Sequence, residues 1–359
     1  MESMIHLESI FAGVLLGTAV GDALGLPREN MSAARAKRWW RSEPLRHRFI
    51  LGRGMVSDDT EHTCLVAQAL LASGGISEQF GIELAARLRW WLAACPAGLG
   101  RATLLGTLRL WCGYHPANSG VYSAGNGPAM RSAMLGIWAG EDVDYLRTLV
   151  HISTHITHTH PDAEHGALAV ALSARFAARN RTAHFNPHEL LAELKHHMPV
   201  GAMSGQLDLV ARHLASNSTP EVFAAELGCR QGVSGYVLST VPAALFCWLK
   251  FPHEFPTAVE QVIQLGGDTD TTGAIVGALA GVVHGATAIP PAWLDGLWEW
   301  PRSVDWMKRL ALRLSEARMA DDPSNVKPLP WRWPLVIPRN AIFLLTVLVH
   351  ALRRLAPPY

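Results

Sequence analysis

The sequence predicts an all-α fold. Apolar residues recur with helical spacing along most of the chain, in stretches rich in Ala and Leu, and no run alternates with the period of two that marks a β-strand. Turns rich in Gly, Pro and Asn, such as residues 112–127, separate these stretches. Hydrophobic residues make up 49% of the 359-residue chain and charged residues 17%, a balance typical of a globular protein with an ample core.

The helical pattern divides the chain into two regions. We expect one all-α domain at residues 5–320, followed at 321–359 by a proline-rich tail that ends in a short apolar helix at 341–352. Within the domain, the expected helices are 7–24, 61–72, 82–94, 129–139, 163–178, 187–197, 207–215, 220–227, 237–249, 257–265, 271–285 and 304–320.

Composition restricts the partners and the compartment. The formal net charge of +1 argues against a nucleic-acid partner, for which a basic surface is expected. The five cysteines form no C-x-x-C pair, and an odd, scattered set indicates reduced thiols in a cytoplasmic protein. The N-terminus carries Glu2 and Glu8 and no early Lys or Arg, so residues 10–21 make a poor signal peptide.

Two apolar stretches raise the question of a membrane. Residues 271–290 are uncharged, with a glycine at every fourth position from Gly273 to Gly285, as in a transmembrane packing face. The acidic pair at the start of this stretch and His284 within it favour a soluble helix that packs closely through its glycines. Residues 341–352 are fewer than the roughly 20 needed to span a bilayer. We expect them to dock on the domain or on a partner rather than to rest on a membrane surface, and we expect no transmembrane span.

Two acidic clusters lie far apart in the sequence, Ser57-Asp58-Asp59-Thr60 and residues 266–272, which read Gly-Gly-Asp-Thr-Asp-Thr-Thr. Each offers two carboxylates flanked by hydroxyls, and such oxygen ligands suit Mg²⁺ or Mn²⁺ rather than zinc or copper. If the fold joins the clusters, four carboxylates meet, and two divalent cations would neutralise them in a binuclear hydrolytic centre. Each cluster alone has a simpler, structural explanation. Acids in the first turn of a helix interact favourably with its dipole and stabilise the helix by less than about 1 kcal/mol.

A loop of small residues, 123–131, precedes one predicted helix. It reads Ser-Ala-Gly-Asn-Gly-Pro-Ala-Met-Arg, and Pro128 suits the first position of a helix. Exposed N–H groups and the helix N-terminus would then face an anion, which predicts a cradle for a pyrophosphate. The alternative is a plain loop-to-helix turn with Asn126 in the left-handed region.

A group of histidines and one acidic loop complete the motifs. His151 and His155 have the spacing of zinc-binding helices, but no Cys or Glu-x-x-His partner accompanies them in the sequence, so zinc is disfavoured. A single histidine beside the cradle, in contact with a nucleotide, is preferred. Asp22, near the end of an apolar helix, is expected to be a structural acid. The alternative is that Glu29, in the following loop, swings over a site; for this segment taken alone, the structural role is preferred.

Taken in order, these motifs resemble those of the ADP-ribosylglycohydrolase family. The resemblance is carried by Gly21-Asp22-Ala23-Leu24-Gly25, Ser57-Asp58-Asp59-Thr60, Gly125-Asn126-Gly127-Pro128-Ala129-Met130-Arg131, Thr157-His158 and Gly267-Asp268-Thr269-Asp270-Thr271. It implies a compact orthogonal helical bundle with a binuclear site for two Mg²⁺ ions, Mn²⁺ being the alternative. The implied activity is the hydrolytic removal of ADP-ribose from modified protein side chains.

The resemblance also assigns roles to residues. It implies that the metals bind to Ser57, Asp58, Asp59, Asp268, Asp270 and Thr271, and that ADP-ribose binds to Ser123, Gly125, Asn126, Gly127, Met130 and His158. Asp58, Asp59 and Glu29 are the candidate catalytic acids, and Glu29 falls where serine-directed members place a mobile glutamate. Some arginine-directed members carry an acid just before the Gly-Asn-Gly motif, and residues 118–122 lack one here. Which carboxyl donates the proton therefore stays open.

Two functions follow as hypotheses. The favoured one is a hydrolase that removes ADP-ribose from arginine in an ADP-ribosylated protein. The alternative is an immunity-type protein that neutralises an ADP-ribosyltransferase toxin by binding and occlusion, with or without hydrolysis. Trp331, Trp333 and the apolar helix of the tail have the character of an interface, whereas the intact set of metal ligands favours retained catalysis.

Overall fold

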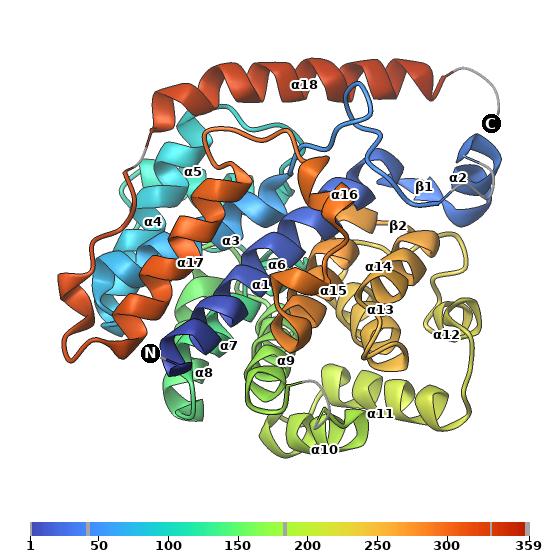
Figure 1. Ribbon diagram of the computed structural model, residues 1–359, viewed down its shortest axis with the longest axis horizontal. Helices are drawn as coiled ribbons and strands as arrows, with labels where there is room; N and C mark the ends of the chain where they lie inside the picture. The colour runs from blue at the N-terminus through green and yellow to red at the C-terminus, as the bar shows by residue number, and fades with distance from the viewer. Residues whose placement is uncertain (1, 41–43, 182–184, 331, 356–359) are drawn as a thin grey trace.

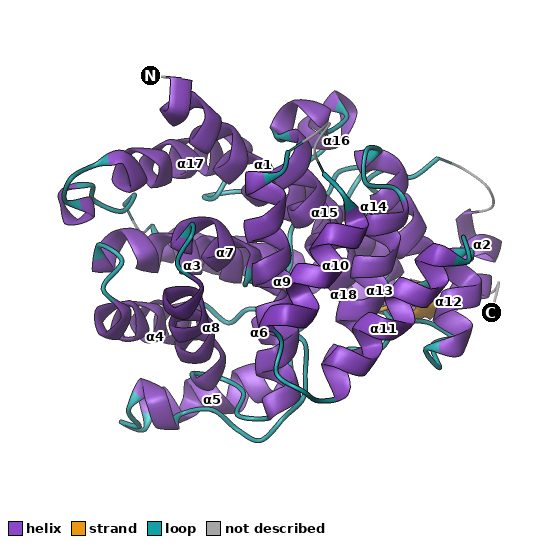
Figure 2. Cartoon of the chain, turned by 90° about the horizontal axis from the view of Figure 1, so that it is seen from below, coloured by secondary structure: helices purple, strands orange, loops and turns teal. Residues whose placement is uncertain are grey.

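The computed structural model describes residues 2–40, 44–181, 185–330 and 332–355. In this part of the chain nearly all regular structure is helical, and the helices pack around a shared core (Figure 1; Figure 2). Two strands of two residues, β1 (Met31–Ser32) and β2 (Gly266–Gly267), pair antiparallel with Met31 opposite Gly267. The prediction of an all-α fold is confirmed.

The α-helices, in chain order, are α1 (Glu2–Gly25), α2 (Ala33–Trp40), α3 (Asp58–Ser73), α4 (Ser77–Ala93), α5 (Arg101–Trp111), α6 (Gly127–Met130), α7 (Ala133–Ala139), α8 (Val143–His155), α9 (Pro161–Arg179), α10 (Pro187–His197), α11 (Ala202–Ala215), α12 (Pro220–Glu226), α13 (Val237–Lys250), α14 (Phe255–Gln264), α15 (Thr269–His284), α16 (Pro291–Asp295), α17 (Val304–Met319) and α18 (Val336–Arg353). A short 3₁₀ turn, η1 (Leu26–Arg28), follows α1.

Some helices differ from the sequence prediction. α2, α5, α8 and α16 are not predicted, and α4 begins five residues before the predicted 82–94. The predicted helix at 129–139 is interrupted, because the backbone of Arg131 leaves the helical region with φ of −106° and ψ of 2°. The buried side chain of Arg131 instead donates hydrogen bonds to Ser153 and Thr157. The break thus falls at a residue with buried polar contacts, whose partners local sequence does not reveal.

α1 and α15 pass through the middle of the molecule side by side (Figure 1). They are antiparallel, and their backbones touch through small residues spaced four apart. A Cβ atom on Gly13 would lie 2.0 Å from the carbonyl oxygen of Gly281, and one on Gly17 would lie 2.1 Å from that of Gly277. A Cβ atom on Gly21 would lie 2.0 Å from the carbonyl oxygen of Gly273. Glycine is thus the residue that this close approach requires, as the spacing in residues 273–285 predicts.

Among the described residues, two helices are long and apolar enough to cross a membrane by length and composition. The first is the segment Met4–Arg28, whose apolar 18-residue stretch is 89% buried inside the protein, as expected of a core helix. The second is α18, of which 22% is buried. At 18 residues, α18 is longer than the predicted apolar segment at 341–352, since it begins at Val336.

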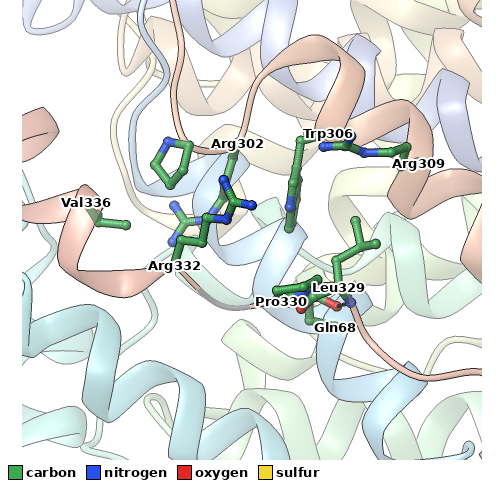
Figure 3. A pocket seen from close by; sticks show the side chains of 9 residues that line it. Gln68, Arg302, Trp306, Arg309, Leu329, Pro330, Arg332 and Val336 are labelled. Carbon is green, nitrogen blue, oxygen red and sulfur yellow. Dashed lines mark hydrogen bonds between the residues drawn. The ribbon is translucent and has the colours of Figure 1, made fainter.

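The tail packs on the domain. The Gln68 side chain of α3 holds the backbone of Leu329 by two hydrogen bonds of 3.0 and 2.9 Å, beside a pocket of about 310 Å³ that Trp306 of α17 also lines (Figure 3). α18 then lies along one edge of the molecule (Figure 1). Its Asn340 side chain donates to the Ala94 carbonyl oxygen at 2.8 Å. The other face of α18 is exposed and apolar, with side chains such as Leu345 open to solvent.

We predict that Gly17→Ala lowers the free energy of unfolding by about 3 kcal/mol or more, because the new methyl group meets the backbone of α15. Gly205→Ala is the matched control. Gly205 lies inside α11, and no atom lies within 4 Å of the place that its methyl group would take, so alanine there should stabilise by about 0.5–1 kcal/mol. Urea denaturation followed by circular dichroism measures both. Equal stability of Gly17→Ala and the parent would contradict the close packing.

Candidate functional site

Asp22 on α1 fixes the first acidic cluster. The Ser57 N–H donates to both carboxylate oxygens of Asp22, at 3.0 and 2.9 Å, and the Thr60 N–H and hydroxyl donate to Asp22 Oδ2. Burial raises the pKa of Asp22 to about 7, although these hydrogen bonds favour its ionised form. Ser57 is in turn the N-cap of α3, since its hydroxyl oxygen accepts the Asp59 N–H. Asp22 thus determines where α3 begins and where its first acids lie.

The second cluster follows a glycine pair that allows a close backbone turn. Gly266 and Gly267 have φ of 74° and 82°, values that favour glycine. A Cβ atom on Gly267 would lie 2.0 Å from the carbonyl oxygen of Val233. That carbonyl accepts the Asp268 N–H at 2.7 Å. α15 begins at the next residue, so Asp268 and Asp270 lie at the start of the helix.

The two clusters meet in space. The Thr271 hydroxyl donates to Asp59 Oδ2 at 3.2 Å, and the Ser57 hydroxyl donates to the same oxygen at 3.1 Å. Residues of both clusters line one cleft of about 430 Å³, namely Asp58, Asp268, Asp270 and Thr271. The structure therefore brings the six predicted metal-ligand residues together.

Two oxygens of the clustered carboxyl groups lack a hydrogen-bond partner among the described residues. Burial raises the pKa of Asp58, Asp59 and Asp270 well above the ordinary value, and neighbouring negative charges raise it further. Within the described chain, Asp59 Oδ1 and Asp270 Oδ1 are buried without a hydrogen-bond partner. Buried oxygens left unpaired in a set of acids and hydroxyls fit a hard divalent cation such as Mg²⁺ or Mn²⁺. The residues thus fit the predicted binuclear centre, and the ions themselves stay a prediction.

The Gly-Asn-Gly loop lines the same cleft, through Ser123, Gly125, Asn126, Gly127 and Met130. The side chain of Asn126 joins this loop to the acids, since its Nδ2 donates to Asp268 Oδ2 at 2.6 Å and to the Thr240 hydroxyl at 3.0 Å. Asn126 has φ of −82° and ψ of −2°, so the alternative of a left-handed turn at this residue is wrong. The helix that follows, α6, is a single turn of four residues.

His158 packs against this loop. A Cβ atom on Gly125 would lie 3.0 Å from His158 Nε2, and one on Gly127 would lie 3.0 Å from its Cε1. Burial, and then the positive charge of Arg131, lower the pKa of His158 to about 3. The imidazole is therefore neutral at physiological pH. Its Nδ1 lies 2.8 Å from the Thr157 hydroxyl, which also accepts a hydrogen bond from Arg131 at 3.0 Å.

Glu29 lines the cleft with the acids of both clusters. It follows η1, and its Oε1 accepts a hydrogen bond from the Asn30 side chain at 2.9 Å. Burial, and then the negative charge of Asp268, raise the pKa of Glu29 to about 7, while the positive charge of Arg354 acts in the opposite direction. Of the three predicted acids, Glu29 and Asp58 line the cleft, and Asp59 accepts a hydrogen bond from Thr271 in its lining.

Sequence analysis does not predict several of the residues that line the cleft. They are Asn30, Gly98, Gly100, Arg101, Ala102, Thr103, Val233, Ser234 and Gly235. The Gly235 carbonyl oxygen accepts the Asn126 N–H at 3.1 Å, so residues 233–235 support the loop from outside. Glycines between apolar stretches are the one signal that marks these segments. Nothing in the sequence marks Arg101, which brings a positive charge to the cleft.

The fold and this cleft can be compared with known proteins. The profile of the family described as ADP-ribosylglycohydrolase matches residues 4–323. The chain belongs to the ADP-ribosylglycohydrolase family. The ADP-ribosyl-[dinitrogen reductase] glycohydrolase of Rhodospirillum rubrum is 28% identical over 301 residues, which cover 79% of this chain and 89% of that protein. An ADP-ribosylarginine hydrolase of Serratia proteamaculans is 24% identical over 319 residues, 83% of this chain and 78% of the relative.

A solved structure supports the same assignment. A chain of an ADP-ribosylglycohydrolase-related protein complex superposes with a TM-score of 0.62 at 27% sequence identity, covering 88% of this chain and 99% of that chain. The family and the fold are thereby established, and members of the family hydrolyse ADP-ribosylated substrates.

We predict that Mg²⁺ stabilises the protein more at about pH 8 than at about pH 5. The acids with raised pKa hold protons at low pH. As the pH rises through their folded-state pKa, they ionise against one another, and the free energy of unfolding of the ion-free protein falls. Cations compete with those protons, so the gain in Tm on adding MgCl₂ grows with pH. Thermal unfolding with and without MgCl₂ tests this, and an equal shift at both pH values speaks against the metal centre.

Proposed function

We propose that this protein releases ADP-ribose from modified arginine side chains of a protein, with two Mg²⁺ ions as cofactors and Mn²⁺ as the alternative. The observation that carries the proposal is the meeting of both acidic clusters with the Gly-Asn-Gly loop in one cleft. Family membership supports a hydrolase of ADP-ribosylated substrates. The free cysteines support our proposal of a cytoplasmic location.

The proposed cation ligands are Ser57, Asp58, Asp59, Asp268, Asp270 and Thr271. When bound, divalent cations supply positive charge that polarises sugar oxygens and water. The chain contributes the orientation of these ligands. The Asn126 amide holds Asp268 Oδ2, and the Thr271 and Ser57 hydroxyls hold Asp59 Oδ2. Such hydrogen bonds to ligands fix their geometry and tune the site.

The loop and His158 are proposed to hold the diphosphate and the distal ribose. Gly125 and Gly127 leave no room for side chains beside the His158 ring, so a ligand can approach the backbone N–H groups closely. The neutral imidazole supplies a hydrogen-bonding edge without charge. Arg101, which lines the same cleft, adds positive charge where a diphosphate would lie.

The leaving group needs a proton. A guanidine is strongly basic and departs readily only when it is protonated, so a carboxyl group must act as a general acid. Asp58, Asp59 and Glu29 all line or adjoin the cleft. Glu29 lies on a separate loop from the clusters, which makes Glu29→Gln informative. Lost turnover with retained Mg²⁺ binding would support Glu29 as the acid, and unchanged turnover would leave the role to the α3 acids.

Arginine is the proposed acceptor because one relative is named for it. The protein of Serratia proteamaculans is named an ADP-ribosylarginine hydrolase, and it covers most of this chain. A chromatographic assay of ADP-ribose release from arginine-modified and serine-modified proteins tests which amino acid is the acceptor. Inertness of the purified, Mg²⁺-loaded protein on both substrates would count against the enzymatic proposal.

We predict that Asp59→Ala and Asp270→Ala each lower turnover by at least about 100-fold, more than the loss of a residue that merely supports a metal ligand. Asp144→Ala is the matched control. Asp144 is likewise an acid in the first turn of a helix, but it is exposed and does not line the cleft, so its loss should leave turnover unchanged. Activity of Asp270→Ala within a few-fold of the parent would contradict the proposed ligand set.

The alternative function, neutralisation of an ADP-ribosyltransferase toxin by binding, is favoured by one observation. The outer face of α18 exposes Leu345, Val349 and Leu352, each more than 60% accessible to solvent. Exposed apolar side chains of this kind often mark an interface. Trp331 lies outside the described residues. Protection against a toxin that survives Asp270→Ala but is lost when the exposed Leu345 and Val349 are replaced by serine would favour this alternative.

A further inference from the structure

α18 lies outside the residues that match the family, yet both of its ends hold backbone segments of the candidate site. At its first turns, Arg339 is buried and its guanidinium forms two hydrogen bonds with Glu299, at 2.9 and 2.6 Å. The same guanidinium donates to the Val56 carbonyl oxygen, and Glu299 Oε2 accepts the Val56 N–H at 3.2 Å. The residue just before Ser57 is therefore held by both of its backbone groups.

The opposite end of the helix holds the loop of Glu29. Arg354, the C-cap of α18, donates from Nη2 to the Pro27 carbonyl oxygen at 3.1 Å. Its own carbonyl oxygen accepts a hydrogen bond from Arg35 of α2. Between the ends, Phe343 packs against Phe49 with ring centroids 5.0 Å apart. α18 is thus fixed at several points along its length.

We propose that α18 is a brace within the chain, with Arg339 and Arg354 as positioning residues for the two segments that carry Ser57 and Glu29. These contacts join residues 27 and 56 to one rigid helix, so the distance between the Glu29 loop and the start of α3 depends on α18. The change in kcat expected below rests on the proposed function, whereas the expected change in hydrogen–deuterium exchange does not.

Arg354→Ala tests the brace, because loss of Arg339 would leave the buried Glu299 carboxylate uncompensated and would report on folding instead. Arg353→Ala is the matched control, since Arg353 lies one residue earlier and its guanidinium lies over the Trp39 ring, 5.4 Å from the centroid. We expect Arg354→Ala to lower kcat about tenfold or more with little change in Mg²⁺ affinity or Tm, and Arg353→Ala to leave kcat unchanged. Equal kcat in Arg354→Ala and the parent would overturn the proposal.

A second readout works without turnover. Hydrogen–deuterium exchange of residues 26–32 is expected to be faster in Arg354→Ala than in the parent or in Arg353→Ala. If the parent is inactive on every substrate, the proposed function fails, and faster exchange still supports the brace. Unchanged exchange of this segment in Arg354→Ala would overturn it in either case.

A separate cluster on α8 and α9 carries an independent inference. His151 and His155 lie one turn apart on α8, and Glu164 lies in the first turn of α9. Glu164 Oε2 is 3.2 Å from His151 Nδ1 and 3.0 Å from His155 Nε2, and one ligand atom of each residue lies within 4.8 Å of the others. Ligand atoms on a tetrahedral zinc ion are about 3.3 Å apart, because its bonds to N and O are about 2.0–2.1 Å long.

We infer that these three side chains bind a divalent transition metal such as Zn²⁺. The sequence disfavours zinc because no third ligand accompanies the two histidines. In the structure, Glu164 of the next helix, α9, supplies that ligand. His151 and His155 also line a pocket of about 360 Å³, which leaves the metal a free position facing solvent. The chain between the two helices carries His158, whose ring packs on the Gly-Asn-Gly loop. A metal here would tie α8 to α9 across the turn that presents His158.

Calorimetric titration with ZnCl₂ tests this site in an Asp270→Ala background, so that the proposed Mg²⁺ centre contributes equally to every sample. Adding His155→Ala should remove one equivalent of bound zinc. In thermal unfolding, it should also remove the increase in Tm that this zinc ion gives. Adding His188→Ala, which alters an exposed histidine on α10, should change neither. Zinc binding that is the same in the His155→Ala and His188→Ala proteins would overturn the inference. Both positions are accessible to solvent, so neither change should prevent folding.

Discussion

The contact between the backbones of α1 and α15 is the constraint on which the site depends. Small residues on both helices let the chains approach until a single methyl group would collide with a carbonyl oxygen. Both helices carry polar groups at the end of this contact, Asp22 on α1 and Asp270 in the first turn of α15. Asp22 then fixes the N-terminus of α3 by hydrogen bonds to Ser57 and Thr60. The close helix pair therefore sets the separation of two acidic clusters that the sequence keeps far apart.

That placement creates an electrostatic problem which a cation would solve. Several carboxyl groups are buried together, and two of their oxygens have no partner among the described residues. Burial, and then repulsion between neighbouring carboxylates, raises the pKa of Asp59 and Asp270. The Asn126–Asp268 hydrogen bond links the acids to the loop that is proposed to hold the diphosphate. Metal binding and substrate binding would therefore share one hydrogen-bond network, in which movement of the loop would shift the proposed metal ligand Asp268.

Sequence patterns predict the parts of the molecule that depend on local spacing. The glycines from 273 to 285, the acidic helix starts and the all-α fold are of this kind, and the family assignment follows from them. The glycines at 13, 17 and 21 show the same spacing, but their pairing with α15 is visible only in three dimensions. Other features depend on partners that are distant in sequence. They are the buried contacts of Arg131, the Asn126–Asp268 hydrogen bond and the hydrogen bond from Arg339 to Val56. Local periodicity holds no information on such contacts.

The central claim is that acids from α3 and α15 form one centre for two hard cations. Anomalous diffraction from crystals grown with Mn²⁺ tests it most directly, because the peaks locate the ions without any assumption about activity. We expect two peaks in the cleft, one or both shared between Asp58 or Asp59 and Asp268 or Asp270. An empty cleft at saturating Mn²⁺, or peaks bound by one cluster alone, would contradict it.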